Sequence, residues 1–275
     1  IYNEEYGDAL YMFEAHVGGE NKEFETFGNA DDILNSSDLL LDMRESKDAY
    51  VDEDMFIRAR LLDMLMGDWD RHEGQYEWAE FEDEDGKKKY LPIAKDRDQV
   101  FPKTDGLALA LLRVGFPQFR AMEEYSPMVK KPKWFNLAGY PLDKAFIRNA
   151  DWKAWEKQAN YIQENITDEV ITEAFNVLPE GLAEDEYVAS IKETLKARRA
   201  NLDEIAKEYY EHLTDFDMFT GTEEDDKFLI TRKPDGITTV ELKNKKGEIL
   251  AAKTYNSDMT KEVWIYGLDG DDEFQ

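Results

Sequence analysis

The clearest pattern of hydrophobic and polar positions lies between Asp52 and Gly67. Hydrophobic side chains there fall on nearly every side of a helix: Met55, Phe56, Ile57, Leu61, Leu62, Met64 and Leu65. A helix that is apolar almost all round is buried inside a larger unit. Asp52 is a good N-cap and Gly67 a good helix terminator. We therefore predict a buried helix from Asp52 to Met66 that holds the residues after it on a rigid support.

A β-hairpin is predicted shortly after this helix. Apolar and polar residues alternate from Gln75 to Phe81, and the acidic run that ends at Gly86 has the composition of a turn. The chain then returns as a strand from Lys88 to Ile93. Within that strand, Pro92 indicates a strand end or a position at the sheet edge.

Helical spacing of apolar residues governs most of the remaining chain up to about residue 215. From Phe219 onward, alternating runs and turn residues predict strands instead. These features predict the α+β class, with a mostly helical lobe that contains the hairpin and a small antiparallel β appendage. The predicted helices are one or two short ones within residues 29–44, one from Thr104 or Asp105 to Val114, one around Trp152–Ile162, one over Asp168–Val177, and a long one after Glu184 whose apolar stripe reaches Tyr209.

Charge restricts the partners of this chain. It has 62 acidic and 34 basic residues among 275, which gives a formal net charge of −28. Such a field repels DNA, RNA and anionic membrane surfaces and attracts cations and basic molecules. We expect no nucleic-acid partner, although simple solubility is an alternative reason for the acidity.

Other features of the composition exclude some kinds of site. Because there is no cysteine, disulfides and thiolate zinc sites are excluded. No apolar run approaches the length of a membrane span, so we expect none. The chain begins at Ile1 rather than at Met and ends abruptly at Gln275, so we expect an excerpt of a longer polypeptide with flanking domains.

Acidic residues gather at both ends of the predicted hairpin: Asp68 and Asp70 before it, Asp96 and Asp98 after it. A hairpin brings its ends together, so these carboxylates should meet in space. They would repel one another unless a cation lay between them. Oxygen donors and an amide favour a hard ion, Mg²⁺, Mn²⁺ or Ca²⁺. The alternative is a charged surface hairpin whose acids are solvated.

The order of these residues resembles a known group of proteins. The motif Gly-Asp-x-Asp-Arg-His-x-x-Gln, a hairpin and then Asp-x-Asp-x-x-Phe are similar to the catalytic half of atypical protein-kinase-like folds, among them the HipA-like, CotH-like and phosphoinositide-kinase-like groups. The resemblance covers roughly Leu10 to Phe101. It implies a catalytic role for Asp70, and it implies that Gln75 and either Asp96 or Asp98 hold Mg²⁺ or Mn²⁺ with ATP.

The chain departs from that group at two places. Gln75 stands where Asn is usual, and the second motif is Asp-Arg-Asp-Gln-Val-Phe rather than Asp-Phe-Gly. The longer Gln leaves the metal geometry open, and the second Asp leaves open which carboxylate is the ligand. Asp68 is a further candidate ligand.

Three basic side chains of the motif have alternative roles. His72 suits general-base work near neutral pH, but the resemblance implies that it holds the loop in place. Arg71 and Arg97 could contact nucleotide, but pairing with the neighbouring acids is the favoured interpretation.

The resemblance also suggests a division of the chain. A strand from Ala9 to Val17 followed by Gly18 and Gly19 is similar to the last strand and hinge of a kinase small lobe, and an ordinary edge strand is the alternative. We therefore predict a hinge-like strand and linker (residues 1–28), a helical kinase-like large lobe (residues 29–215) and the β appendage (residues 216–275).

The appendage contains a repeat. The pattern Gly-x-x-x-Asp-Asp-x-Phe begins at Gly221 and again at Gly267, each time at a turn that leads into a strand. It loosely resembles a calcium-binding β-roll turn, for which the candidate ligands are Asp225, Asp226, Asp271 and Asp272. Plain turns are the favoured interpretation, and an alternative is that the repeat marks two equivalent strand entries in one sheet.

Two functions remain open. The first is a metal-dependent phosphotransferase that uses nucleotide and an unknown hydroxyl acceptor; hydrolysis of phosphate esters is less well supported, because the chain has only His16, His72 and His212. The second is a non-catalytic, kinase-like binding or spacer module of a larger bacterial protein. No Gly-x-Gly-x-x-Gly or Gly-x-x-x-x-Gly-Lys-Ser/Thr sequence occurs, which favours the second. The cell envelope or periplasm is slightly favoured over the cytoplasm.

Overall fold

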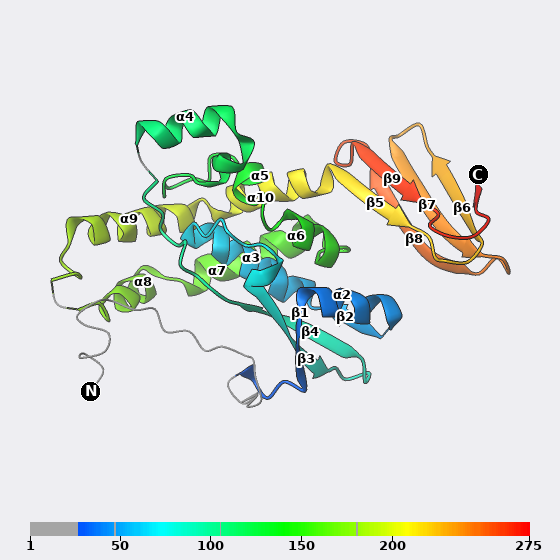
Figure 1. Ribbon diagram of the computed structural model, residues 1–275, viewed down its shortest axis with the longest axis horizontal. Helices are drawn as coiled ribbons and strands as arrows, with labels where there is room; N and C mark the ends of the chain where they lie inside the picture. The colour runs from blue at the N-terminus through cyan, green and yellow to red at the C-terminus, as the bar shows by residue number, and fades with distance from the viewer. Residues whose placement is uncertain (1–26, 47, 105, 180) are drawn as a thin grey trace. The chain divides into compact units, whose positions relative to one another are not determined.

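The computed structural model describes residues 27–46, 48–104, 106–179 and 181–275 (Figure 1). Its helices and strands form a mixed α+β arrangement. The chain divides into two compact units, Ile1–Lys207 and Glu208–Gln275. The predicted hinge-like strand from Ala9 to Val17, with Gly18 and Gly19, lies outside the described residues.

The first unit contains a four-stranded sheet in the order β1-β3-β4-β2. Its centre is the predicted hairpin, which is confirmed: β3 and β4 pair antiparallel from Tyr76↔Ala94 to Glu82↔Lys88. Strand β2 pairs with β4 only as far as Tyr90, so Pro92 lies where β4 has a single neighbour. The strands are β1 (Asp32–Asn35), β2 (Ala49–Val51), β3 (Tyr76–Glu82) and β4 (Lys88–Ala94).

The buried helix predicted from Asp52 to Met66 is also confirmed, as α3 (Glu53–Met66). Asp52 accepts a hydrogen bond from Met55 N at 3.0 Å, and Gly67 ends the helix with a left-handed φ of 82°. Phe56 on this helix meets the rings of Trp78 on β3 and of Phe146 edge-on. Helix and hairpin therefore share one aromatic core.

Two predictions about helices were confirmed only in part. Within residues 29–44 the chain first forms β1, where Ile33 and Leu34 pair with β3, and then a single helix α2 (Ser36–Glu45). Pairing with β3 outweighs local helical spacing here. The long helix predicted after Glu184 is broken at Asn201, which caps the end of one helix while its carbonyl accepts the hydrogen bond of Ile205 N in the next. The apolar stripe runs through this break, so spacing alone could not reveal it.

Two of the other helices pack against α3. Helix α7 packs along α3, and α9 contacts both. Helix α4, predicted from its leucines, is present but has no buried residue. The helices after the hairpin are α4 (Leu107–Gly115), η3 (Pro117–Ala121), α5 (Pro132–Phe135), α6 (Tyr140–Phe146), α7 (Trp152–Asn165), α8 (Asp168–Phe175), α9 (Glu186–Ala200) and α10 (Leu202–Thr214).

The second unit contains a four-stranded sheet in the order β10-β6-β7-β8 and a two-stranded sheet of β5 and β9. Strands β6, β7 and β8 are antiparallel, but β10 joins β6 and β9 joins β5 in parallel. The prediction of an antiparallel appendage was therefore wrong for these two pairs, because strands that start equivalent turns run in the same direction. The strands are β5 (Phe216–Thr220), β6 (Asp226–Arg232), β7 (Ile237–Asn244), β8 (Ile249–Asn256), β9 (Glu262–Tyr266) and β10 (Glu273–Phe274).

Candidate functional site

Asp63, a fully buried residue on α3, is the centre of the charged groups behind the hairpin. Its Oδ2 accepts hydrogen bonds from Tyr76 Oη at 2.5 Å and from Arg60 Nη1 at 2.9 Å. Its Oδ1 accepts one from Arg97 Nη1 at 2.6 Å. A buried carboxylate needs such partners, because an unpaired charge in this environment would be costly. Asp63 thereby joins α3 to both sides of the hairpin.

Arg71 joins the two ends of the hairpin to each other. Its buried guanidinium donates to Gln75 O at 2.9 Å and to Lys95 O at 2.7 Å, with a longer contact to Asp96 O at 3.3 Å. In addition, Lys95 N donates to Gln75 O. The two hairpin ends therefore meet as predicted, but no three of the four carboxylates expected there gather into one group among the described residues. Since its fork of donors faces backbone carbonyls and acids, Arg71 positions the loop from inside the protein.

Asp68, a candidate metal ligand, is held by arginines. It is fully buried, with Oδ2 3.2 Å from Arg71 Nη1 and 3.7 Å from Arg97 Nη1, while its Oδ1 accepts no hydrogen bond from the described residues. Burial raises the pKa of Asp68 to about 6, although both arginines act to lower that pKa. Arg71 and Arg97 thus pair with neighbouring acids, which is the interpretation that the sequence favoured over contact with nucleotide.

Gln75 and Asp96 lie against each other across the base of the hairpin. Gln75 Nε2 donates to Asp96 Oδ2 at 3.0 Å, although 21 residues separate them. Gln75 is buried and Asp96 is partly exposed. The backbone of Asp96 is left-handed, with φ of 50°, a conformation that is uncommon outside glycine. The structure therefore brings the loop amide and one of the two candidate metal carboxylates into contact.

His72 shapes the loop between them. Its Nδ1 accepts a hydrogen bond from Gly74 N at 3.1 Å and caps the short helix η2 (Glu73–Gln75). Its Nε2 lies 3.5 Å from Gln75 Nε2. The bond from Gly74 N to Nδ1 fixes the ring with its Nε2 edge beside the Gln75 amide. His72 and Gln75 are therefore held as one turn.

Asp70 and Asp98 are more open to solvent. Asp70 lies partly exposed in the loop between α3 and η2, and Asp98 is exposed. Neither side chain forms a hydrogen bond or an ion pair with the described part of the chain. The segment after Asp98 returns to α3, because Phe101 N donates to Met66 O at 2.9 Å. The loop that contains Asp70 and the loop that contains Asp98 are thus both fixed to the C-terminal end of α3.

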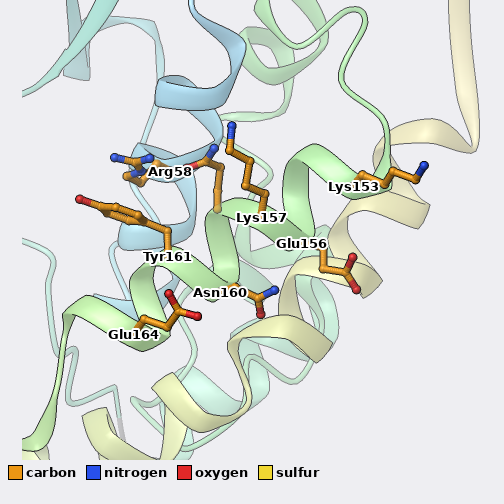
Figure 2. Close-up of a pocket in the computed structure, with 8 residues that line it drawn as sticks. Arg58, Lys153, Glu156, Lys157, Asn160, Tyr161 and Glu164 are labelled. Atoms are coloured by element: carbon orange, nitrogen blue, oxygen red, sulfur yellow. Dashed lines mark hydrogen bonds between the residues drawn. The ribbon is translucent and has the colours of Figure 1, made fainter.

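Within the described ranges, no three acidic or histidine side chains converge as a ready-made metal cage. The Gln75–Asp96 pair offers oxygen donors of the kind that hard cations prefer. A separate shallow hollow lies along α7 and includes Arg58 of α3 (Figure 2). In that hollow, Arg58 Nε donates to Gln158 at 2.8 Å and its guanidinium covers the ring of Tyr161. None of the predicted site residues lines it.

Of the four aspartates considered for Ca²⁺ in the second unit, three use their carboxylates in bonds to the protein itself: Asp225, Asp226 and Asp272. Asp225 Oδ1 accepts from Asp271 N at 3.1 Å, and Asp272 Oδ1 accepts from Asp226 N at 3.0 Å. Asp225 also pairs with Lys245. These bonds join the two repeated turns as equivalent starts of the neighbouring strands β6 and β10, which is the alternative interpretation of the repeat.

Sequence reasoning did not identify three residues that support the site. Arg60 and Asp63 are a charged pair three positions apart in the mainly apolar second half of α3, and that contrast was the signal available. Arg198 on α9 is buried, stacks over a tyrosine ring and donates to Met64 O at 3.0 Å. Its partners are backbone carbonyls, so the sequence held no sign of its role.

Comparison of the chain with protein-family models, with curated proteins and with solved structures finds no match. In the described ranges, no helix has both the length and the hydrophobicity that crossing a bilayer requires.

Proposed function

We propose that the first unit is a kinase-like phosphotransferase site that binds a nucleotide together with Mg²⁺ or Mn²⁺. The observation that carries this proposal is the 3.0 Å contact between Gln75 Nε2 and Asp96 Oδ2. Mg²⁺ that is bound to a nucleotide is coordinated by only one or two protein carboxylates. Phosphate oxygens and water fill its other coordination positions. An amide and a carboxylate in contact at a loop end match that requirement, and a cage of three acids is not needed.

The donor set fits the ion in charge and hardness. Asp96 and the Gln75 amide oxygen would hold the metal, because both are oxygen ligands. In the structure the Gln75 amide nitrogen faces Asp96 Oδ2, so a rotation of the amide would turn its oxygen toward the ion. When bound, the ion supplies neutralisation of the negative charge on the nucleotide phosphates.

Of the remaining residues, Asp70 acts on the acceptor hydroxyl, and His72 and Arg71 have positioning roles. The carboxylate of Asp70 is partly exposed and carries no bond to the described residues, so it can accept the proton of an incoming hydroxyl. His72 holds the Gln75 turn, and Arg71 fixes the carbonyls of Gln75 and Lys95. Because α3, the hairpin and Arg71 form one buried network, these groups keep their places before any ligand arrives.

The test compares two neighbouring aspartates of the same motif. Binding of ATP with Mg²⁺ should be measured by calorimetry for the wild type, Asp96→Asn and the matched control Asp98→Asn. We expect Asp96→Asn to lose at least tenfold in affinity and the exposed control to stay within about twofold. Asp70→Asn should keep nucleotide binding and lose turnover by orders of magnitude. Equal binding by wild type and Asp96→Asn would refute the proposal.

A second candidate is a non-catalytic binding or spacer module of a larger cell-envelope protein. The observation that favours it is Asp68, a candidate ligand whose carboxylate is instead held by Arg71 and Arg97. This module would keep its fold and bind neither Mg²⁺ nor nucleotide. The same calorimetry separates the two functions, because no heat from any of the four proteins leaves only the module.

A further inference from the structure

The second unit is built from two layers that repeat with one spacing. Strand β5 pairs in parallel with β9 from Phe216↔Glu262 to Thr220↔Tyr266, and β6 pairs with β10 by Phe228↔Phe274. Figure 1 draws β5 and β9 side by side within this unit. Partners in both ladders are 46 residues apart, the same separation as between the hydrogen-bonded turn aspartates. Residues 216–261 thus form a first layer, and residues 262–275 form a second layer that lies on it in register. This is the geometry of a stacked repeat.

The repeated turns are matched atom by atom. Asp271 N donates to Asp225 Oδ1, and Asp226 N donates to Asp272 Oδ1. Each bond joins equivalent positions of the two layers. A Cβ on Gly221 would lie only 2.6 Å from Gly267 O, so the layers approach too closely for any other residue there. The conserved spacing of Gly and Asp within this chain is therefore explained by contact between layers.

The aromatic residue of the first repeat is covered by the second layer. The rings of Phe228 and Phe274 are stacked at 4.6 Å between centroids and 3° between planes. Phe228 is fully buried as a result, whereas Phe274 is 50 % exposed. The first layer is thus complete only because the second lies on it, and the second has no such cover among the described residues.

The outer side of the second layer repeats the features that the first layer presents to it. Strand β10 is at the end of its sheet, and β9 pairs only with β5 among the described strands. The Asp271 carboxylate accepts no hydrogen bond from the described residues, whereas its equivalent, Asp225, accepts one from the layer above. Open strand edges of this kind accept further strands through their backbone groups.

We propose that the outer edge of β9 and β10 is a docking surface for a third layer: a strand–turn–strand segment with the pattern Gly-x-x-x-Asp-Asp-x-Phe that adds in parallel at the same register. Its backbone would extend both ladders, its turn would bond to Asp271, and its phenylalanine would cover Phe274. The first layer of a second copy of this chain does not fit, because its β6 is already flanked by β7 and β10. Continuity with the existing interface between layers selects the occupant.

The test supplies such a layer to the full chain. A copy of residues 230–275 is added after Gln275, which places the added aromatic residue in register with Phe274. Hydrogen exchange should slow at least tenfold for the amides of β9 and β10. The NMR chemical shifts of the Phe274 ring should report its burial. The matched control carries Gly267→Val and Phe274→Asp within the added copy only, and it should leave exchange in β9 and β10 unchanged.

Two results would overturn the proposal. One is an added layer that stays unfolded, or that protects β9 and β10 no better than the control. The other is a dimer of the original chain in sedimentation that Phe274→Asp abolishes, since a second copy would then be the occupant. As an independent measurement, a synthetic peptide of residues 262–275 at millimolar concentration should slow exchange at β10, and a scrambled peptide should not.

Discussion

Tyr76 donates its hydroxyl hydrogen to Asp63 Oδ2 at 2.5 Å, which joins the first residue of the hairpin to the buried helix. Burial and the neighbouring Asp63 raise the pKa of Tyr76 well above its usual range, so the hydroxyl stays protonated and donates at every physiological pH. Asp63 also carries bonds from Arg60 and Arg97, and the tyrosine completes the set of donors around it.

Replacing this hydroxyl tests the network. We expect Tyr76→Phe to lower the free energy of unfolding by about 1–3 kcal/mol, because a buried charged acceptor loses a donor. The matched control is Tyr50→Phe, since the Tyr50 hydroxyl bonds to Asp83 at an exposed position. That change should cost less than about 0.5 kcal/mol. Urea unfolding of both variants measures the difference, and equal losses would contradict the role given to Asp63.

Arg71 should not tolerate lysine. One ammonium cannot reach the carbonyls of Gln75 and Lys95 while it pairs with Asp68, so bonds to buried acceptors are lost. We expect Arg71→Lys to destabilise the protein by about 2–4 kcal/mol. Arg97→Lys should cost less, because Arg97 is 26 % exposed. A larger loss at Arg97 than at Arg71 in denaturant unfolding would show that the arginine roles are reversed.

Asp68 predicts a pH dependence of stability. Its pKa is raised from 3.8 to about 6, so between those values the folded protein binds more protons than the unfolded chain. The free energy of unfolding therefore falls as the pH rises from about 4 to 6, and the extra stability, about 3 kcal/mol, is fully present only below that window.

Removing the carboxyl group isolates this effect. Asp68→Asn should flatten the slope of unfolding free energy against pH between pH 4 and 6, relative to wild type. The exposed Asp98→Asn is the control and should leave that slope in place. Parallel curves for Asp68→Asn and wild type would show that another group titrates.

Gly67 should be more sensitive than Gly86, although both have left-handed backbones with φ of 82° and 77°. A Cβ at Gly67 would lie 2.8 Å from Tyr125 Cδ2, whereas one at Gly86 would meet only a glutamate oxygen at 4.0 Å. Gly86→Ala should cost about 1 kcal/mol from backbone strain alone. Gly67→Ala should cost that amount and roughly 1–3 kcal/mol more for overpacking. Thermal denaturation compares the two, and equal costs would mean that Tyr125 moves aside freely.

The elements that could be predicted were those with local signals. Asp52 and Gly67 mark the ends of α3, and the turn at Gly86 marks the hairpin, because caps and turns depend on a few adjacent residues. Strand β1 and the break at Asn201 were missed, since one depends on pairing with β3 and the other interrupts no apolar stripe. The parallel pairing of β5 with β9 depends on contacts 46 residues apart.

The site follows the same division. The meeting of the two hairpin ends followed from topology, which is why Gln75 and Asp96 could be placed together in advance. The environment of Asp68 could not be predicted, because a sequence motif does not show that the Arg71 side chain turns inward. Arg71 and Arg198 bond largely to backbone carbonyls, and any residue type can supply a carbonyl. Acids that look alike in sequence therefore differ in surroundings: Asp68 is buried, Asp96 is hydrogen-bonded to Gln75 and Asp98 is exposed to solvent.

Because the backbone at Asp96 is left-handed, the residue type preferred there shows whether folding or activity is being selected. Glycine adopts that conformation without strain, and asparagine tolerates it nearly as well as aspartate, while β-branched residues do not. A variant library sorted only for folding should drift toward glycine there. If sorting for activity instead restores aspartate from that pool, the carboxylate is required for activity. Aspartate is then retained although glycine would relieve the backbone strain.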